Sequence, residues 1–257
     1  MTASILPLKL TNVSFEAGSM RLIKDLNLTL EAGPRTAVIG PNGAGKSLLL
    51  RLCHGLLKPS SGTVEWRQSP GQDAADHQAM VFQRPVMLRR SAAANIGYAL
   101  KLKGIHGAER RERIDEALAR AGLRRLAAQP ARVMSFGEQQ RLALARAWAL
   151  RPQVLFLDEA TASLDPAATH AVEEMIHAIH AEGTRIILTT HDLGQARRLS
   201  DEVVFLHRGR MLEKAPSEKF FEKPENDLAQ AFVKGELLWW RKRELDDSQK
   251  HAPRYRR

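Results

Sequence analysis

Long apolar runs are missing from this sequence, and so is the pattern of a secretory leader. No stretch approaches the roughly 18 to 20 consecutive apolar residues that cross a bilayer, and residues 1–10 lack a basic segment followed by an apolar core. A membrane-spanning or exported chain is therefore not expected. Cysteine is nearly absent as well: the single Cys53 excludes an internal disulfide and agrees with a reducing compartment.

Acidic residues are outnumbered, with 39 Lys and Arg against 29 Asp and Glu, a formal net charge of +10. This excess suits nucleic acid and the anionic inner face of a membrane equally well, so charge alone does not choose a partner. The basic tail, residues 236–257, is expected to be a solvated terminus. The 257 residues, 44% hydrophobic and 26% charged, are typical of a globular protein with a sizeable core.

The hydrophobic pattern predicts an α/β fold. Residues 8–15 and 22–30 alternate apolar with polar side chains, which is typical of half-buried antiparallel strands. Short apolar runs separated by helical patterns then predict a mainly parallel sheet covered on both faces. These runs are residues 36–39, 79–82, 154–157, 185–188 and 203–206.

Several helices are expected around that sheet. Residues 47–57 are predicted to form a helix that stops before Pro59. Residues 166–182 form another, with Asp165 as N-cap and Gly183 just past its end. Residues 109–123 and 138–150 have helical patterns without an intervening β-run, so a helical subdomain is expected between the sheet strands.

A glycine-rich loop directly after the strand 36–39 matches the P-loop pattern in full. Its residues are Gly40, Pro41, Asn42, Gly43, Ala44, Gly45, Lys46 and Ser47, followed by Leu48. Glycines let the backbone approach phosphate oxygens, and the helix N-terminus attracts the anion. Lys46 is expected to reach the β- and γ-phosphates, and Ser47 offers a hydroxyl to Mg²⁺.

A second candidate feature is the apolar strand 154–157, which ends in the carboxylate pair Asp158 and Glu159. Successive strand residues point to opposite sides, so the two carboxylates can have different roles. Asp158 is expected to hold Mg²⁺, and Glu159 to polarise the attacking water.

The segment 134–141, Met-Ser-Phe-Gly-Glu-Gln-Gln-Arg, lies just before that strand and resembles the signature motif of the ATP-binding cassette (ABC) ATPases. The resemblance spans residues 8–233 and implies a P-loop ATPase that binds ATP and Mg²⁺. It implies adenine stacking on Phe15, a Q-loop glutamine at Gln83 that also serves the metal, a D-loop at residues 163–165, and a switch histidine at His191. Catalysis would then involve Glu159, His191, Gln83 and Lys46.

The same resemblance implies a single cassette over residues 1–235, with residues 1–85 and 151–235 as its core and residues 86–150 as the helical subdomain. ATP would also contact Ser135, Gly137 and Glu138 of a second chain. Two departures stand out: Phe136 replaces a glycine, and Glu138 replaces the usual glutamine. Because a β-carbon restricts the backbone, we expect Phe136 to affect the affinity of the ATP-bound dimer.

The expected partners are a second copy of the cassette, a transmembrane permease docked near Gln83, and indirectly a secreted substrate-binding protein, with no nucleic acid. The chain would then lie on the cytoplasmic face of the inner membrane. A rival interpretation is an ABC ATPase that acts on nucleic acid or ribosomes, but those proteins usually have two cassettes, a long coiled-coil insertion or zinc-binding cysteines. A non-hydrolysing module is disfavoured because Glu159 and His191 are both present.

Residues 80–91 resemble the corresponding part of the ATPases of bacterial tungstate importers. This segment follows the Q-loop and would meet the permease, so its side chains should vary with the permease that is bound. Residues 234–257 are also too few for a further regulatory domain, since domains below about 40 residues seldom fold unaided. Tungstate is therefore the expected cargo, with phosphate or another oxyanion as alternatives and an amino acid less favoured.

Overall fold

The computed structural model describes residues 4–67 and 73–236, and all structural statements concern these residues. The strands are β1 (Leu8–Ala17), β2 (Met20–Leu30), β3 (Thr36–Ile39), β4 (Ser61–Trp66), β5 (Gln78–Val81), β6 (Val154–Asp158), β7 (Arg185–Thr189), β8 (Glu202–His207) and β9 (Arg210–Pro216). The α-helices are α1 (Lys46–His54), α2 (Ala92–Leu102), α3 (Gly107–Arg120), α4 (Phe136–Trp148), α5 (Pro166–Ala181), α6 (Leu193–Leu199), α7 (Ser217–Glu222) and α8 (Asp227–Val233). Short 3₁₀ turns occupy Ala74–His77, Arg124–Leu126 and Ala131–Val133.

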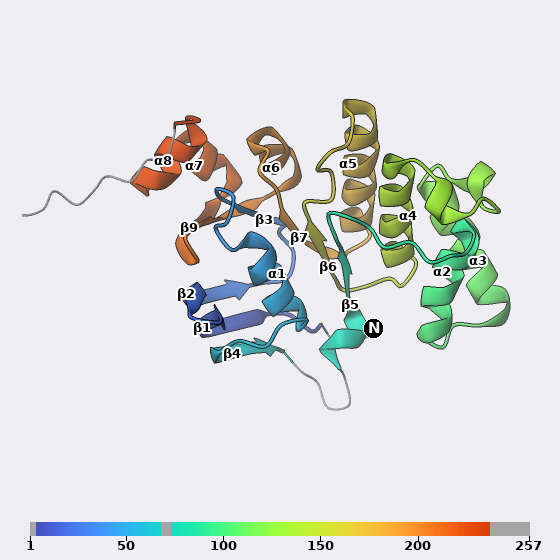
Figure 1. Ribbon diagram of the computed structural model, residues 1–257, viewed down its shortest axis with the longest axis horizontal. Helices are drawn as coiled ribbons and strands as arrows, with labels where there is room; N and C mark the ends of the chain where they lie inside the picture. The colour runs from blue at the N-terminus through green and yellow to red at the C-terminus, as the bar shows by residue number, and fades with distance from the viewer. Residues whose placement is uncertain (1–3, 68–72, 237–257) are drawn as a thin grey trace, which may run out of the picture.

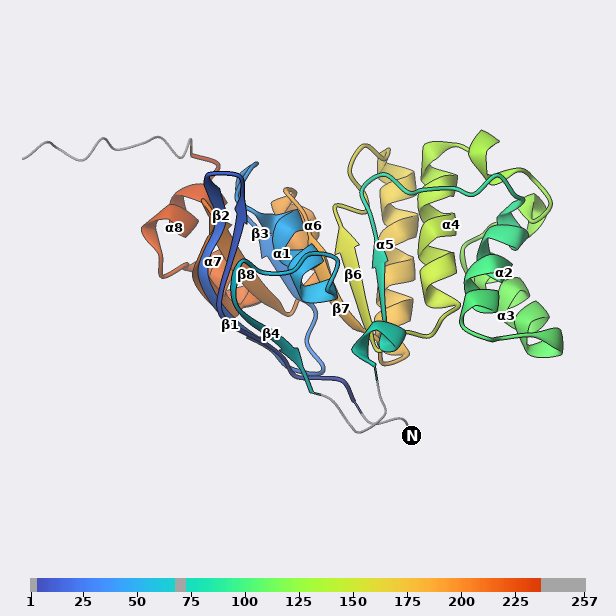
Figure 2. The same cartoon turned by 60° about the horizontal axis from the view of Figure 1, so that its bottom comes forward.

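The strands form two sheets, as the alternating and continuous apolar patterns predict. The larger sheet has the order β5-β6-β7-β3-β8-β9 and is parallel except for the β8–β9 hairpin. The smaller sheet, β2-β1-β4, is antiparallel. Helix α1 lies between the two sheets in Figures 1 and 2, and this arrangement brings the loop before α1 to the edge of the larger sheet. The α/β fold class is confirmed.

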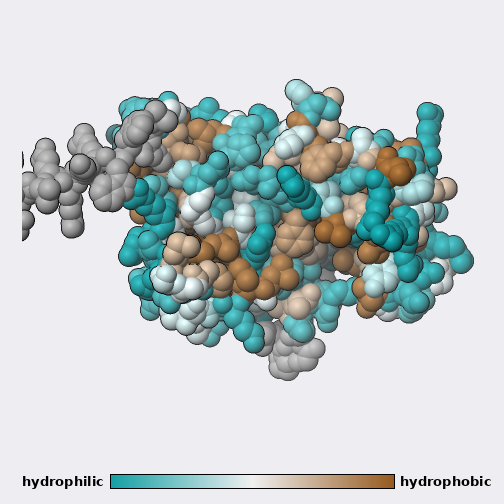
Figure 3. All heavy atoms as spheres, viewed as in Figure 1, coloured by the Kyte–Doolittle hydropathy of each residue, from teal (hydrophilic) through white to brown (hydrophobic). Residues whose placement is uncertain are grey.

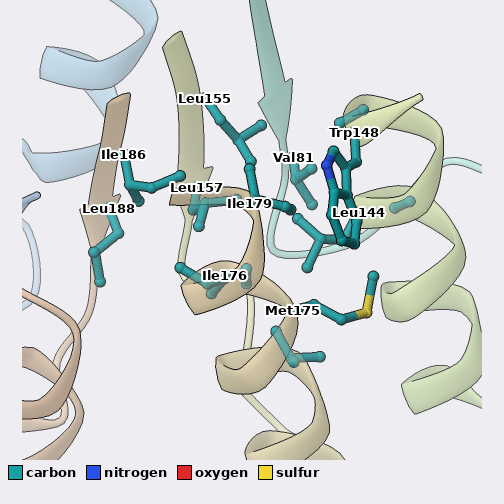
Figure 4. Close-up of a cluster of buried hydrophobic side chains, with 14 of the residues drawn as sticks. Val81, Leu144, Trp148, Leu155, Leu157, Met175, Ile176, Ile179, Ile186 and Leu188 are labelled. Carbon is teal, nitrogen blue, oxygen red and sulfur yellow. The ribbon is translucent and has the colours of Figure 1, made fainter. Parts of the chain in front are cut away.

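Strand β6 divides the core into two halves because its side chains alternate. Val154 and Phe156 pack with α1 and the antiparallel sheet, whereas Leu155 and Leu157 pack toward α4 and α5. Figure 4 shows the second half, where Leu155 and Leu157 lie near side chains of those two helices. The same alternation puts the next residue, Asp158, on the α1 side.

Helices α2, α3 and α4 lie between β5 and β6 in the sequence and to one side of α5 in Figure 1. Their buried residues, such as Leu100 and Leu118, belong to the same apolar cluster as Leu155 and Leu157. The helical segment therefore shares a continuous core with the sheet through α4 and α5. No helix in the described part of the chain is long and apolar enough to cross a membrane.

Some element bounds differ from the predicted ones. Helix α1 ends at His54 rather than at residue 57, because Gly55 adopts a left-handed conformation (φ 84°) and its N–H bonds to the carbonyl of Leu52. The pattern also missed the strands β4 and β9 and the helices α2, α6, α7 and α8. β4 is a largely exposed edge strand, and β9 follows the tight turn at Arg208 and Gly209, both at positive φ.

Candidate functional site

The glycine-rich loop leaves β3 and enters α1 through backbone conformations that require glycine. Gly40, Gly43 and Gly45 all have positive φ, and a β-carbon on Gly40 would collide with the carbonyl of Leu206. Helix α1 begins with Gly45 as N-cap, without a side-chain cap and without an acidic residue in its first turn. The amide groups at this helix end are therefore available to an anion.

Lys46 is the first residue of α1 and folds back over the loop. Its Nζ donates hydrogen bonds to the carbonyls of Gly40 (3.0 Å) and Pro41 (3.3 Å), and only 6% of the side chain is exposed. Burial lowers the pKa of Lys46, while the carboxylates of Glu159 and Asp158 oppose that change. The ammonium is thus a desolvated cation in the loop, suited to an anionic ligand.

Ser47 and Asp158 form the next contact. The Ser47 hydroxyl donates to Asp158 Oδ1 at 2.7 Å, and the Thr189 hydroxyl donates to the same oxygen at 2.9 Å. Arg51, one turn along α1, places Nη2 3.9 Å from Asp158 Oδ2. Sequence reasoning identified Ser47 and Asp158 but missed Thr189 and Arg51. Thr189 is the direct neighbour of Asp158 in the β6–β7 register, which the sequence does not reveal.

Glu159 is the centre of a second set of contacts. Its Oε2 lies 3.4 Å from both Gln83 Nε2 and His191 Nδ1, and its Oε1 lies 3.9 Å from Lys46 Nζ. Glu159 has a positive φ of 47°, and its N–H points to the Thr189 hydroxyl at 3.0 Å. A non-glycine residue held at positive φ is frequently found at functional sites.

These residues come together because parallel strands end at one edge of a sheet. Gln83 follows β5, Glu159 follows β6 and His191 follows β7, three strands that are neighbours in the larger sheet. Ligands of open α/β sheets bind at this carboxyl edge. The structure thus brings Lys46, Ser47, Gln83, Asp158, Glu159 and His191 into one cluster.

The donor set suits a magnesium ion. Asp158 supplies a carboxylate, Ser47 a hydroxyl, and Gln83 an amide oxygen on the neighbouring strand end. These are hard oxygen ligands, and Mg²⁺ is usually held by one or two carboxylates together with ligand phosphates. Within residues 4–67 and 73–236 no cluster of three or more His, Cys, Asp or Glu side chains is arranged to hold a metal ion.

Phe15 lies beside this loop through its strand partner. It pairs with Ile23 across β1 and β2, so both side chains lie on the same face of the antiparallel sheet. Ile23 Cδ1 would be only 2.7 Å from a β-carbon on Gly45. Phe15 and Leu48 are partly buried against the apolar cluster that contains Ile23 and Ala44. The half-exposed Phe15 ring is available for stacking.

Ser135, Gly137 and Glu138 lie at the N-terminus of α4, apart from the cluster around Lys46. Ser135 is the N-cap and forms a capping box with Glu138. A β-carbon on Gly137 would be 3.1 Å from that of Ala168 in α5, so this turn packs closely on α5. Among the described residues, the contacts of Ser135 and Gly137 are with the α4 and α5 ends rather than with the glycine loop. Phe136 is 37% exposed.

Comparison with known proteins agrees with this geometry. The sequence profile of the ABC transporter family matches residues 23–162, more than half of the chain. The chain therefore belongs to the ABC transporter family, as an ATP-binding cassette and an ATPase of that family.

Three similar proteins illustrate the relationship. A phosphate import ATP-binding protein of Natronomonas pharaonis is 35% identical, covering 90% of this chain and 88% of its own length. A tungstate uptake ATP-binding protein of Peptoclostridium acidaminophilum is 39% identical over 79% of this chain and 95% of its own length. A solved ATP-binding cassette, dimeric in a post-hydrolysis state with ADP and Pi, is 28% identical with a TM-score of 0.72, covering 82% of this chain and 98% of that one.

Proposed function

We propose that the chain binds and hydrolyses Mg-ATP at the Gly40–Ser47 loop and thereby drives a membrane permease for import. The observation that carries this proposal is the 2.7 Å hydrogen bond from Ser47 on α1 to Asp158 on β6. Beside this pair, the Glu159 carboxylate is in contact with Lys46, Gln83 and His191. The amide groups of the loop and Lys46 would bind the phosphates, and Phe15 would stack on adenine.

Ser47, Asp158 and Gln83 would hold Mg²⁺, which neutralises charge on the β- and γ-phosphates when bound. Glu159 orients a water for in-line attack on the γ-phosphate and accepts its proton. His191, 3.4 Å from Glu159, and Gln83 hold that carboxylate in position. Phosphoryl transfer needs positioning and charge stabilisation more than covalent chemistry, and these contacts supply the part of both that lies within one chain.

The working unit is a dimer in which each chain completes the site of the other. Ser135, Gly137 and Glu138 lie away from the Lys46 cluster within one chain, and the solved cassette in the post-hydrolysis state is dimeric. We assign Ser135 and Gly137 to the γ-phosphate bound by the second copy. ATP then favours the closed pair, and phosphate release opens it.

The permease docks on the surface that surrounds Gln83 and helix α2. Apolar side chains are exposed there, namely Phe82 (36%), Val86 (69%), Tyr98 (38%) and Leu102 (70%). Figure 3 shows separate apolar patches among hydrophilic residues on the face of the molecule that is seen in Figure 1. Such residues suit a protein partner at the cytoplasmic face of the inner membrane, where a secreted binding protein would act only through the permease.

The cargo we propose is tungstate or a related oxyanion. The support is the similarity to a tungstate uptake protein and to a phosphate import protein, since both cargoes are tetrahedral oxyanions. The alternative of an ABC ATPase acting on nucleic acid has no supporting observation in these relatives.

Deleting the gene and measuring uptake of tungstate, phosphate and methionine separates the cargoes. Loss of tungstate uptake alone is expected, and unchanged tungstate uptake in a strain without a second system would contradict this cargo.

A further inference from the structure

Within a single chain, the Glu138 carboxylate accepts a hydrogen bond from the Ser135 hydroxyl. Its Oε2 accepts hydrogen bonds from the Ser135 N–H (2.8 Å) and from the Ser135 hydroxyl (2.9 Å). The Glu138 N–H donates in return to the Ser135 oxygen at 3.3 Å. A hydroxyl has one proton to donate, and a bond to a carboxylate is charge-assisted. The proton of Ser135 is therefore committed to Glu138 before any ligand arrives.

We propose that Glu138 restrains the ATP-driven association of two chains. This inference rests on the proposed function, in which Ser135 contacts the γ-phosphate bound by the second copy. To donate to that phosphate, the hydroxyl must leave the Glu138 carboxylate. The carboxylate then lies beside phosphate oxygens. Two negatively charged groups that are close together repel each other in a partly dehydrated site.

The charge of Glu138 can be separated from its capping role. Glutamine, the usual residue at this position, keeps an oxygen that accepts the Ser135 N–H but has no charge to oppose the phosphate. A role confined to capping α4 predicts that Glu138→Gln leaves association unchanged or weakens it. Restraint by the charge predicts the opposite, a tighter ATP-bound dimer.

The test uses the full chain with Glu159→Gln, which slows hydrolysis so that the ATP-bound dimer persists. Sedimentation velocity measures the dimer dissociation constant in Mg-ATP, with and without Glu138→Gln. We expect Glu138→Gln to tighten the dimer by about tenfold, given the strength of like-charge repulsion near a protein surface. Glu112→Gln, the same charge change at an exposed position on α3, is the matched control and should not alter the dimer.

Two further measurements test whether the effect of Glu138 is on the dimer rather than on ATP binding. ATP affinity at low protein concentration should be equal in all variants, because Glu138 lies away from the chain's own Gly40–Ser47 loop. With Glu159 intact, Glu138→Gln should lower the protein concentration at which the ATPase rate is half-maximal. An ATP-bound dimer that Glu138→Gln does not tighten would overturn this inference alone. Absence of an ATP-bound dimer in every variant would overturn the proposed function and this inference with it.

Discussion

Ser47 and Asp158 are joined by a 2.7 Å hydrogen bond although they come from α1 and the end of β6. The bond presents a hydroxyl and a carboxylate side by side, the arrangement that a magnesium ion with bound phosphates requires. The Thr189 hydroxyl donates to the same carboxylate oxygen and helps to hold it in place.

The first prediction concerns these two residues. Asp158→Asn should reduce Mg²⁺-dependent ATP hydrolysis by about a hundredfold or more and raise the Mg²⁺ concentration needed for half-maximal rate. Ser47→Ala should shift the same Mg²⁺ concentration in the same direction. Thermal unfolding followed by circular dichroism checks that both variants fold. An unchanged Mg²⁺ requirement in both would exclude this pair from the metal site.

Lys46→Ala should weaken nucleotide binding itself. The Lys46 ammonium is desolvated in the loop, and a hydrogen bond to a charged group contributes about 1.5–3 kcal/mol, so ATP affinity should fall roughly tenfold or more. Titration with a fluorescent ATP analogue gives the dissociation constant. Lys58→Ala, an exposed lysine shortly after α1, is the control and should bind normally. Equal affinity in the Lys46 variant would contradict the assignment of the loop.

The thiol of Cys53 should be nearly inert in the folded protein. Burial in α1 raises the pKa of Cys53 to about 12, so almost no thiolate is present at neutral pH. Iodoacetamide should alkylate it far more slowly in the native protein than in denaturant, as mass spectrometry would reveal. Comparable rates in both conditions would mean that α1 is not packed as the structure indicates.

Asp201 should make stability depend on pH in the acid range. Hydrogen bonds from Arg35 lower the pKa of Asp201 below its usual value. Because the folded-state pKa is the lower one, this contribution is present above about pH 4 and is lost as pH falls through the folded pKa. Asp201 is 41% exposed, so Asp201→Asn should cost about 0.5–1 kcal/mol of unfolding free energy at pH 7.

Urea unfolding at pH 7 and at several values below pH 4 measures this effect. The difference between wild type and Asp201→Asn should shrink as the pH falls. Asp115→Asn, an exposed carboxylate on α3, should show little difference at any pH. A difference between wild type and Asp201→Asn that grows toward low pH would contradict the assigned direction of the pKa shift.

The sequence predicts the parts of the fold that depend on local pattern. Strand β3 has the predicted bounds, and Asp165 caps α5 as expected. Both features depend on residues that are adjacent in the sequence, so they can be predicted from it. Lys46, Ser47, Asp158 and Glu159 were predicted from motifs whose spacing reflects their chemistry.

Features that depend on register were not predictable. Thr189 reaches Asp158 only because β6 and β7 pair at that position. The capping box of Ser135 and Glu138, by contrast, follows the local pattern Ser-x-x-Glu, which the sequence analysis did not use. Residues 237–240, Leu-Leu-Trp-Trp, lie outside the described residues together with the rest of the basic tail.

The most direct test of the catalytic assignment is the ATPase rate of Glu159→Gln together with its oligomeric state in Mg-ATP. Glutamine keeps the size of the side chain but cannot accept a proton from water, so turnover should fall by about 10²–10⁴-fold. Unhydrolysed ATP should then hold two chains together as a dimer in size-exclusion chromatography. Turnover near that of the wild type, with no ATP-stabilised dimer, would contradict the assignment of Glu159 as the catalytic residue.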